Sequence, residues 1–402
     1  MMMASETDVV VSAVARTPFG RFNGMLRHCS APHLGAAVID AVLDRAPLPA
    51  REIEAAYLGV GMIGAATLTP VRQAVLLSRL PNETPSLTVD RACCSGMTAV
   101  GLGFKDIRAG EAATVLCGGF ESLSQTPLLM PRNRERMIGT TVLDDPLLLR
   151  GPVVDKPIAA YTGDEAIRHG VDRAAQDAWA VQSHQRYFAA DAAGYFDFER
   201  LAIDVPDGKS GMVSVDKDES PRADTSVEKL AKLKPVYGSP TVTPGNAPGL
   251  NDGAAALLLT TAAKARANGL PILARIRGYQ QVAEGPTSGS YTPAIAIGTL
   301  LRRHNLTVDH LDLIEINEAF AATVLVSTLR LAGGDKAAAD KLRARTNAQG
   351  GAVAIGHPLG ASGTRLVMTL INGLRRRGGG LGAAAICGGF GQGDSILIEV
   401  RD

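Results

Sequence analysis

Residues 89–110, VDRACCSGMTAVGLGFKDIRAG, place two adjacent cysteines where a helix is predicted to begin. Apolar residues recur at spacings of three and four, Ser95-Gly96 stands before them, and Gly110 follows as a stop signal. Unpaired backbone N–H groups and the dipole at a helix N-terminus favour a thiolate, which is the nucleophilic form of cysteine. Cys93 and Cys94 are therefore candidate nucleophiles, and the alternative is that they pack as small apolar side chains.

Composition limits the class of protein. The 402 residues, 46% apolar and 44 of them glycine, are typical of a well-buried α/β protein with about two or three packed units. A net charge of +1 favours neither nucleic acid nor a membrane surface as partner. Five irregularly spaced cysteines indicate neither a disulfide framework nor a zinc site and favour a reducing compartment. Glu6 and Asp8 stand where a targeting peptide would be basic, and no apolar run approaches the ~18 residues of a membrane span, so we expect a cytoplasmic protein.

Apolar runs on both sides of the cysteines predict strands at 9–14, 55–60 and 114–120 and a helix at 33–44. Gly59, Gly61 and Gly64 have the spacing of a dinucleotide-binding loop. The acidic residue that this fingerprint requires about 20 residues later would fall in a turn near Pro81 rather than at a strand end. We interpret the loop as a tight glycine-rich turn, with a nucleotide-dependent dehydrogenase as an alternative.

Residues 121–249 differ in character from the flanking sequence, because proline, charged residues and short amphipathic helices dominate. A long helical pattern at 172–193 around Trp179 indicates an inserted subdomain rather than a linker. Basic residues cluster near Arg132 and at Lys229, Lys232 and Lys234. Such clusters are most often solvated faces, and the alternative is a site for a phosphate-bearing ligand.

The last part of the chain repeats the first. Ser95-Gly96, a helix and Cys117-Gly-Gly-Phe are echoed by Ser362-Gly363, a helix and Cys387-Gly-Gly-Phe. This repeat predicts two similar α/β halves, each with a helix that begins near a Ser-Gly pair. If the halves pack as a pair, both helix N-termini and the strand end at Cys387 would meet at one cleft.

Three segments of the C-terminal half carry polar residues next to apolar stretches that are predicted to be buried. IEINEAFAA (314–322) puts Asn317 and Glu318 after a strand, where a helix cap is the structural alternative. NAQGGAVAIGHPLGASG (347–363) sets His357 before the second helix, where a lone histidine is more often a satisfied core residue. AICGGFGQG (385–393) places Cys387 at a strand end whose glycines let backbone N–H groups approach a ligand.

Taken together, these residues resemble the thiolase family, the acyl-CoA:acetyl-CoA C-acyltransferases, over nearly the whole chain. The most specific motifs are Cys93-x-Ser95-Gly96, Asn317-Glu318-Ala319-Phe320, Gly356-His357-Pro358 and Cys387-Gly388-Gly389. The resemblance implies a five-layered αβαβα fold made of two similar βα halves. It implies an N-terminal half at 1–120 completed by 250–270, an inserted coenzyme A-binding loop domain at 121–249, and a C-terminal half at 271–402.

The resemblance also implies roles for single residues. Cys93 would accept the acyl group, His357 would be its base, and Cys387 would move the α-proton of the second substrate. Asn317, through a water, and His357 would form one oxyanion hole, and the N–H groups of Cys93 and Gly389 the other. A thiolate attacks thioesters well, and each preorganised donor is worth on the order of 10²–10³ in rate. Cys94 falls in a variable slot and is expected to be structural.

The coenzyme A site implied by the resemblance comprises Arg222, Ala247, Pro248, Phe320 and Ala159. Asp90 replaces a usual Asn and would oppose a nearby thiolate, and Pro248 takes a place often held by a coenzyme-binding Ser. Ile158 and Ala159 replace a usual His and Met, which argues against a pocket that takes only acetyl groups.

We therefore expect a thiolase that cleaves 3-oxoacyl-CoA or condenses two acyl-CoA molecules, with a substrate range wider than acetoacetyl-CoA. No cofactor is expected beyond coenzyme A thioesters as substrates, and the resemblance implies a homo-oligomer, a dimer or tetramer. A decarboxylating ketoacyl synthase would carry a second His in place of Cys387. A catalytically reduced acyl-CoA-binding protein would be the other alternative, and the intact catalytic motifs argue against it.

Overall fold

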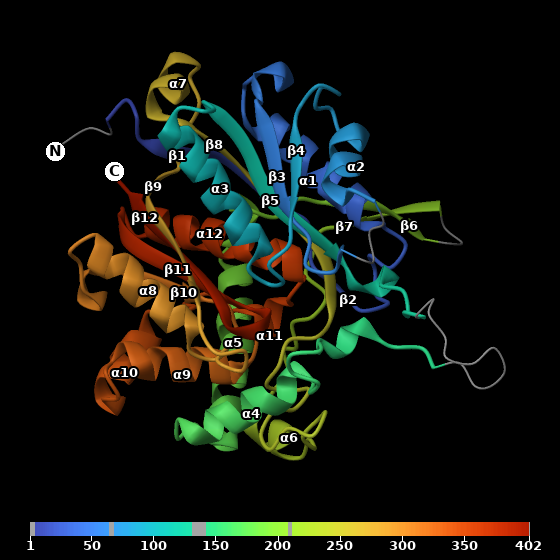
Figure 1. Cartoon of the computed structure of the whole chain (residues 1–402), viewed down its shortest axis with the longest axis vertical. Coiled ribbons are helices and arrows are strands. Elements are labelled where there is room, and N and C mark those ends of the chain that lie inside the picture. Colours follow the sequence, from blue (N-terminus) through green and yellow to red (C-terminus); the bar gives the residue numbers. More distant parts are fainter. Residues whose placement is uncertain (1–4, 64–67, 131–141, 208–210, 402) are drawn as a thin grey trace.

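A computed structural model describes residues 5–63, 68–130, 142–207 and 211–401, and its centre is one large mixed sheet (Figure 1). The strands run in the order β10-β11-β12-β9-β1-β8-β5-β3-β4, and the short β2 pairs with β8. In chain order the strands are β1 (Val9–Arg16), β2 (Gly20–Arg21), β3 (Ala55–Gly59), β4 (Ser86–Val89), β5 (Thr114–Ser122), β8 (Asn251–Thr261), β9 (Ala274–Ala283), β10 (Leu313–Ile316), β11 (Gly380–Gly388) and β12 (Gln392–Val400).

The two halves of this sheet have the same strand pattern. In the N-terminal half β3 is parallel to β5, followed by antiparallel β8 and β1; in the C-terminal half β10 is parallel to β11, followed by antiparallel β12 and β9. Within the described ranges a short β1–β9 pairing joins the two halves of the sheet, through Val10↔Arg275 and Val11↔Ala274. The predicted internal repeat is therefore confirmed in the topology.

Helices form three further layers. Between the half-sheets lie α3 (Ser95–Ala109) and α12 (Leu359–Arg376), each of which packs against strands of both halves. Outside the N-terminal half lie α1 (Ala31–Arg45) and α2 (Pro70–Leu77), and outside the C-terminal half lie α8 (Thr292–Arg303) and α9 (Ala321–Leu331). The arrangement is the five-layered αβαβα fold that the resemblance implied.

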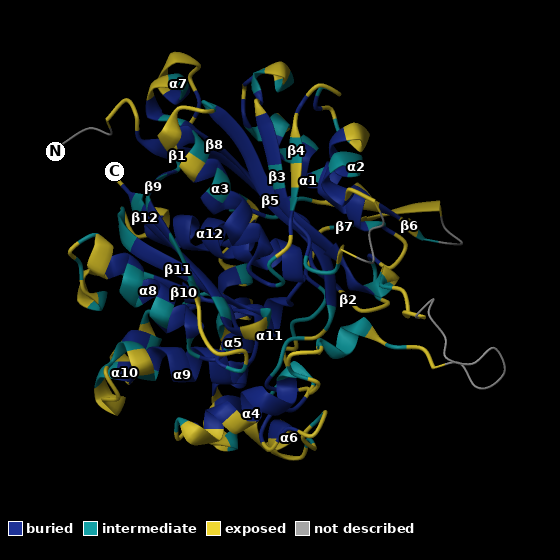
Figure 2. Cartoon of the chain, viewed as in Figure 1, coloured by how far each residue is buried: buried dark blue, intermediate teal, exposed yellow. Residues whose placement is uncertain are grey.

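The position of α12 follows from its sequence. Every residue from Leu359 to Leu374 is buried, and Figure 2 shows this helix dark blue at the centre of the molecule. Its apolar residues pack in the middle layer, while buried polar side chains such as Ser362 and Arg365 have partners inside the protein, His357 and Glu315. Three separate apolar clusters fill the middle layer and the two outer helix-sheet interfaces, as five layers require.

Between β5 and β8 the chain forms a further region of the molecule. It contains α4 (Ile158–Arg168), α5 (Arg173–Ala192), α6 (Val227–Ala231) and the hairpin of β6 (Ile203–Asp207) and β7 (Gly211–Val215). Helices α4 and α6 lie at the bottom of Figure 1, and the strand hairpin lies at the right. The helix predicted at 172–193 is α5, and the Asp172 side chain accepts a capping hydrogen bond from the N–H of Ala175 at 2.8 Å. The remaining helices are α7 (Ala262–Ala267), α10 (Lys336–Ala344) and α11 (Ala352–Ile355).

A buried ion network ties this region to the N-terminal half. Arg16 Nε donates to Glu199 at 2.6 Å and Arg16 Nη1 donates to Asp218 at 2.7 Å, and all three side chains are fully buried. Breaking one side of such a network leaves a charge unpaired in a dry interior, which is strongly destabilising. The position of the inserted region relative to β1 is therefore fixed rather than linker-like.

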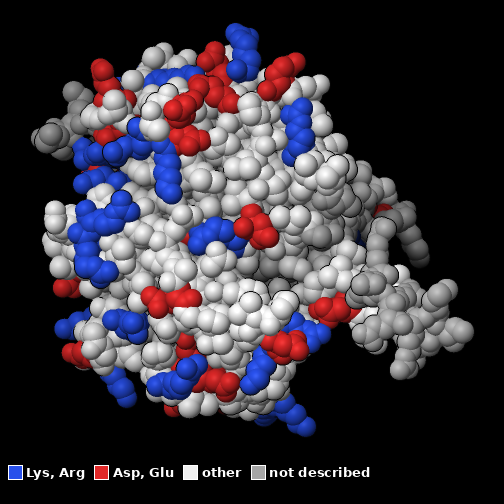
Figure 3. Space-filling view, viewed as in Figure 1, with Lys and Arg blue, Asp and Glu red and all other residues white. Residues whose placement is uncertain are grey.

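Surface charges of both signs are interspersed on the face in Figure 3. Lys229 of the predicted basic cluster pairs with Asp224 at 2.6 Å, whereas the cluster near Arg132 lies largely outside the described residues. In the described ranges, none of the helices has the length and apolar character needed to cross a membrane.

Candidate active site

Cys93 lies at the sharp turn that leads into α3, as the sequence predicted. Ala92 has a left-handed φ of 51°, a conformation that costs a non-glycine residue about 1–2 kcal/mol and is common at functional sites. Ser95 closes the turn, because its Oγ donates to Ala92 O at 2.5 Å and accepts from the N–H of Arg91 at 2.9 Å. Asp90 is exposed and accepts from the N–H of Ala92 at 3.0 Å, so a polar contact survives there.

Glycines let the N-termini of α3 and α12 touch. A Cβ on Gly96 would lie 2.3 Å from the Gly360 carbonyl oxygen, and one on Gly119 would lie 1.9 Å from the same oxygen. A Cβ on Gly59 would lie 2.4 Å from the N atom of Gly96. The glycine at the start of the dinucleotide-like pattern therefore serves close packing, while Gly64 of that pattern lies outside the described residues.

His357 is held in one orientation by three neighbours. The backbone N–H of His357 donates to Asn251 Oδ1 at 2.9 Å, and the ring nitrogen Nδ1 lies 2.6 Å from Ser362 Oγ. Because the Ser362 hydroxyl already donates to Pro358 O at 2.8 Å, Nδ1 must donate to Ser362. Nε2 is then the unprotonated nitrogen, and Asn317 Nδ2 lies 3.3 Å from it. This tautomer leaves Nε2 as the proton acceptor.

Cys387 occupies the end of β11, next to the Cys93 turn. A Cβ on Gly388 would lie 2.9 Å from both Arg91 O and Cys94 Sγ, and one on Gly389 would lie 3.4 Å from the Ala92 side chain. Cys94 is fully buried and its thiol donates to Ile386 O at 3.5 Å, in line with the structural role expected for it. The glycines after Cys387 thus allow the two cysteine segments to pack in direct contact.

Electrostatics bear on one sequence prediction. Burial raises the pKa of the Cys93 thiol well above its ordinary value, and the nearby Cys387 and Glu121 raise it further. Burial therefore opposes the thiolate that the helix N-terminus was expected to favour. Burial also raises the pKa of Cys387 to about 12 and lowers the pKa of His357 to about 3. The site holds two neutral thiols and a neutral imidazole.

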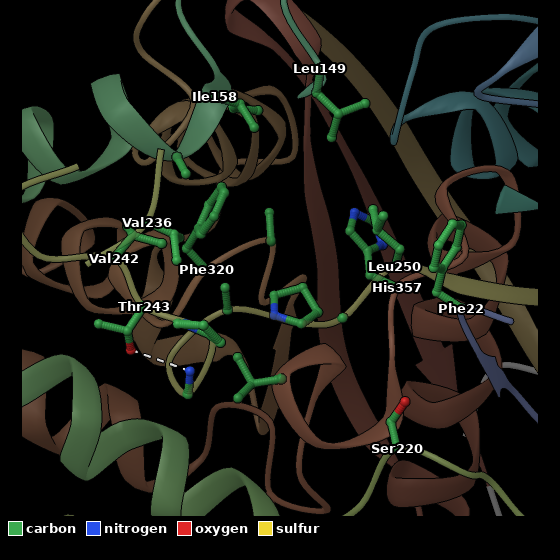
Figure 4. Close-up of a pocket in the computed structure, with 18 of the residues that line it drawn as sticks. Phe22, Leu149, Ile158, Ser220, Val236, Val242, Thr243, Leu250, Phe320 and His357 are labelled. Atoms are coloured by element: carbon green, nitrogen blue, oxygen red, sulfur yellow. Dashed lines mark hydrogen bonds between the residues drawn. The ribbon is translucent and has the colours of Figure 1, made fainter. Parts of the chain in front are cut away.

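Cys93 and His357 open onto a cavity of about 400 Å³. All five predicted coenzyme A-binding positions line it as well: Arg222, Ala247, Pro248, Phe320 and Ala159. In Figure 4, His357 faces the cavity near Leu250 and Phe22, with Phe320 across from it and Ile158 and Leu149 above. Asn317, Cys387 and Gly389 are not in the cavity wall and reach the site through their contacts with His357 and the Cys93 turn.

The cavity is mostly apolar, with polar groups gathered at one part of its wall. Ser220, Arg222 and His184 belong to this part, and the N–H of Arg222 donates to His184 Nδ1 at 3.1 Å. Burial and the Arg222 charge lower the pKa of His184 to about 4, so the imidazole is neutral there. The apolar lining comprises Leu123, Leu147, Leu148, Leu149, Ile158, Val236, Val242, Leu250, Phe320, Val353 and Leu359.

Sequence reasoning missed two buried carboxylates. Glu121 accepts hydrogen bonds from the N–H groups of Gly61, Met62 and Gly360, directly beside the Cys93 turn. Glu318 was interpreted as a possible cap, but it is fully buried and binds four donors: Trp179 Nε1, Ser183 Oγ, Asn347 Nδ2 and the N–H of Val353. A charged residue inside an otherwise apolar or glycine-rich run was the available signal for both.

Comparisons with known proteins agree with this geometry. The family description "Thiolase, N-terminal domain" matches residues 9–263, and "Thiolase, C-terminal domain" matches residues 270–400. The fold and site thus define an acyltransferase built from two related halves. The chain belongs to the thiolase family.

Relatives and solved structures extend over nearly the whole chain. An acetyl-CoA acetyltransferase of Pseudomonas aeruginosa is 40% identical over 97% of this chain and 99% of its own length. A beta-ketoadipyl-CoA thiolase of Pseudomonas knackmussii is 40% identical over 98% and 99% of the two chains. The crystal structure of human mitochondrial 3-ketoacyl-CoA thiolase superimposes with a TM-score of 0.91 at 35% identity, covering 99% of this chain and 100% of that one.

Proposed function

We propose that this thiolase transfers acyl groups reversibly between acyl-CoA and acetyl-CoA through an acyl-Cys93 intermediate. It would cleave a 3-oxoacyl-CoA with coenzyme A or condense two acyl-CoA molecules. The observation that carries the proposal is that Cys93 and His357 line one cavity while the Cys387 segment packs directly against the Cys93 turn. That set provides a nucleophile, a base and a second proton carrier.

The first step needs the base, because Cys93 is a thiol at rest. His357 Nε2 takes the thiol proton as Cys93 Sγ attacks the keto carbon of the 3-oxoacyl-CoA. The bond between the second and third carbons then breaks, and the electron pair remains on the acetyl-CoA enolate. Cys387 gives its proton to that enolate, and its protonated form is the one that burial favours.

In the second step coenzyme A releases the acyl group. The coenzyme thiol attacks the Cys93 thioester and its proton passes to the Cys387 thiolate that the first step left. Cys93 leaves as the thiol carrying the proton from His357, so all three groups regain their starting protonation. Asn317 Oδ1 is buried and has no hydrogen-bond partner within the described part of the chain. It can hold a water that donates to the thioester oxygen together with protonated His357, while the N–H groups of Cys93 and Gly389 serve the other oxyanion.

The cavity supports a coenzyme A thioester as substrate. Arg222 and Ser220 suit the polar nucleotide end, and the apolar wall around Ala159, Ile158 and Phe320 suits the acyl end. Because a small Ala159 lines the wall, we infer a substrate range wider than acetoacetyl-CoA. The names of relatives, acetyl-CoA acetyltransferase and beta-ketoadipyl-CoA thiolase, are compatible with such variation within the family.

We infer further that the enzyme works in the cytoplasm without a cofactor and as a homo-oligomer. Exposed Leu76 and Leu77 on α2 and exposed Leu87 on β4, the last strand in the sheet order, support a subunit contact there. Size-exclusion chromatography with light scattering measures the assembly, and a monomer at micromolar concentration would contradict it.

The function is tested by incubation with acetyl-CoA followed by peptide mass spectrometry, which should place the acetyl group on Cys93. Cys387→Ala should still acetylate Cys93 and exchange label between acetyl-CoA and coenzyme A. Its thiolysis and condensation should fall by the ~10²–10⁴ typical of a general acid or base. An acetyl label on Cys94 or Cys387, or a folded Cys387→Ala variant that cannot acetylate Cys93, would overturn these roles.

A further inference from the structure

A buried ion pair connects the two cysteine segments, and the reaction scheme does not use it. Arg91 lies two residues before Cys93, and Asp394 lies seven residues after Cys387, on β12. Arg91 Nη1 contacts Asp394 Oδ1, and the two side chains are 18% and 0% exposed. A charge pair withdrawn from water costs hydration energy unless further hydrogen bonds satisfy both groups.

Those further bonds are present. Arg91 Nε donates to Gln392 Oε1 at 2.9 Å, and Arg91 Nη1 donates to Thr98 Oγ1 at 2.9 Å. The hydroxyls of Thr98 and Tyr279 each donate to Asp394 Oδ2 at 2.6 Å. The Arg91–Asp394 pair therefore sits in a satisfied network that includes α3, β9 and β12, and its geometry is fixed from several sides.

The same two segments also touch through the backbone. Gly388 leaves no room for a side chain, because a Cβ there would lie 2.9 Å from Arg91 O. Cys94 Sγ donates to Ile386 O at 3.5 Å on the other side of this contact. The Arg91 side chain thus binds Gln392 and Asp394 of β12, while the Arg91 carbonyl contacts the Cys387 segment.

We propose that Arg91 and Asp394 are positioning residues that set the separation of Cys93 and Cys387. The inference rests on the function proposed above. Acyl transfer between thioesters needs Cys93 and His357, whereas cleavage or formation of the carbon–carbon bond also needs the Cys387 thiol at the correct distance. The pair therefore acts on the step that requires both cysteines.

The experiment compares the two reactions in the same variants. Asp394→Asn keeps the shape of the side chain and removes the charge, and Arg91→Lys keeps the charge but cannot bind Gln392 and Thr98 at once. Arg275→Met is the matched control, because it removes the ion pairs of Arg275 with Asp8 at 2.6 Å and with Glu399 at 3.5 Å, at the far end of the same strands. Acetyl-CoA/coenzyme A exchange and acetoacetyl-CoA thiolysis are measured, with urea unfolding to confirm the folded fraction.

Asp394→Asn should exchange label at close to the unaltered rate while kcat for thiolysis falls by about 10²-fold, the cost of a misplacement of about 1 Å. In Asp394→Asn the KM for acetoacetyl-CoA should change little. Arg91→Lys should show a smaller loss of thiolysis kcat, and Arg275→Met should show no loss. Equal losses in both reactions, or no loss of thiolysis in folded Arg91→Lys and Asp394→Asn, would overturn the proposal. If the unaltered chain fails to exchange, the proposed function fails instead.

Discussion

Glu121 Oε2 accepts a hydrogen bond from the N–H of Gly360 at 3.0 Å, which fastens the first turn of α12 to the end of β5. The same oxygen accepts from the N–H of Gly61 at 2.8 Å, and Oε1 accepts from the N–H of Met62 at 3.2 Å. Burial nevertheless raises the pKa of Glu121 to about 7, because three amides do not replace the water that the carboxylate loses. A titrating group therefore lies beside Cys93 in the working pH range.

Glu121→Gln tests this carboxyl through stability. A carboxyl whose pKa is higher in the folded chain than in the unfolded chain stabilises folding below its ordinary pKa, and this contribution declines as pH rises through about 7. Gln cannot titrate, so the unaltered chain should lose its advantage in free energy of unfolding over Glu121→Gln as pH rises from about 5 to about 8. Urea unfolding of both chains across this pH range measures the difference. A difference that stays constant with pH, or grows, would show that Glu121 remains ionised throughout.

Ser362→Ala tests the tautomer of His357. Without the Ser362 oxygen, the Nδ1 proton loses its acceptor and the imidazole is free to place its proton on Nε2. Acetylation of Cys93 should fall by about 10–10²-fold, less than the ~10²–10⁴ expected for His357→Ala, which removes the base. Stopped-flow acylation with acetyl-CoA measures the rate.

The control for Ser362→Ala is Thr364→Val in the same helix. Thr364 Oγ1 is buried and has no partner among the residues that the structure describes, so removal of this hydroxyl breaks no hydrogen bond. Equal effects of Thr364→Val and Ser362→Ala would mean that the Ser362 hydroxyl acts only through packing.

The pH profile of acyl transfer follows from the low pKa of His357, which burial brings to about 3. A base with that pKa is neutral throughout the pH range in which the chain is folded and assayed. The acid limb of kcat/KM for exchange should therefore lie well below the ordinary imidazole value of about 6.5. Because Glu121 titrates near Cys93, the profile is repeated in Glu121→Gln. A midpoint near 6.5 in both would mean that His357 is hydrated in solution.

Ala159→Met tests the acyl end of the cavity. The longer side chain would fill space beside Ile158 and Phe320, so long 3-oxoacyl-CoA substrates should lose kcat/KM while acetoacetyl-CoA keeps it. Each displaced methylene contact is worth about 1–3 kcal/mol, or about 10–200-fold. Ile167→Met, on an exposed position of the same helix, is the control. A uniform loss over all chain lengths would place the acyl tail elsewhere.

Much of the fold was readable from local pattern. The repeat of Ser-Gly, helix and Cys-Gly-Gly-Phe predicted two equivalent halves, and β5 and β11 do occupy equivalent places in the sheet. The helix expected after Ser362-Gly363 is α12. These features succeed because strand and helix periodicity, and the need to bury apolar faces, act over short stretches of chain.

Roles that depend on distant partners could not be read in this way. Glu318 looked like a cap because its own neighbours suggested one, whereas its four donors come from α5, from the loop before α11 and from α11. The helix-end argument for a Cys93 thiolate likewise left out the opposing effect of burial on the pKa of this thiol. Hydration is lost through packing by the whole molecule, and no local motif reports it.

The sequence by itself determined the two repeated halves with several of their strands and helices, the placement of Cys93 at a helix start, and the family resemblance that named His357, Cys387 and Asn317. Only the tertiary structure decided that Nε2 of His357 is the unprotonated nitrogen, that burial raises the pKa of both thiols, and that Arg91 and Asp394 join the two cysteine segments. Periodicity records which face of a segment is buried. Protonation and distance depend on which groups from remote segments surround an atom, and these contacts exist only in the folded chain.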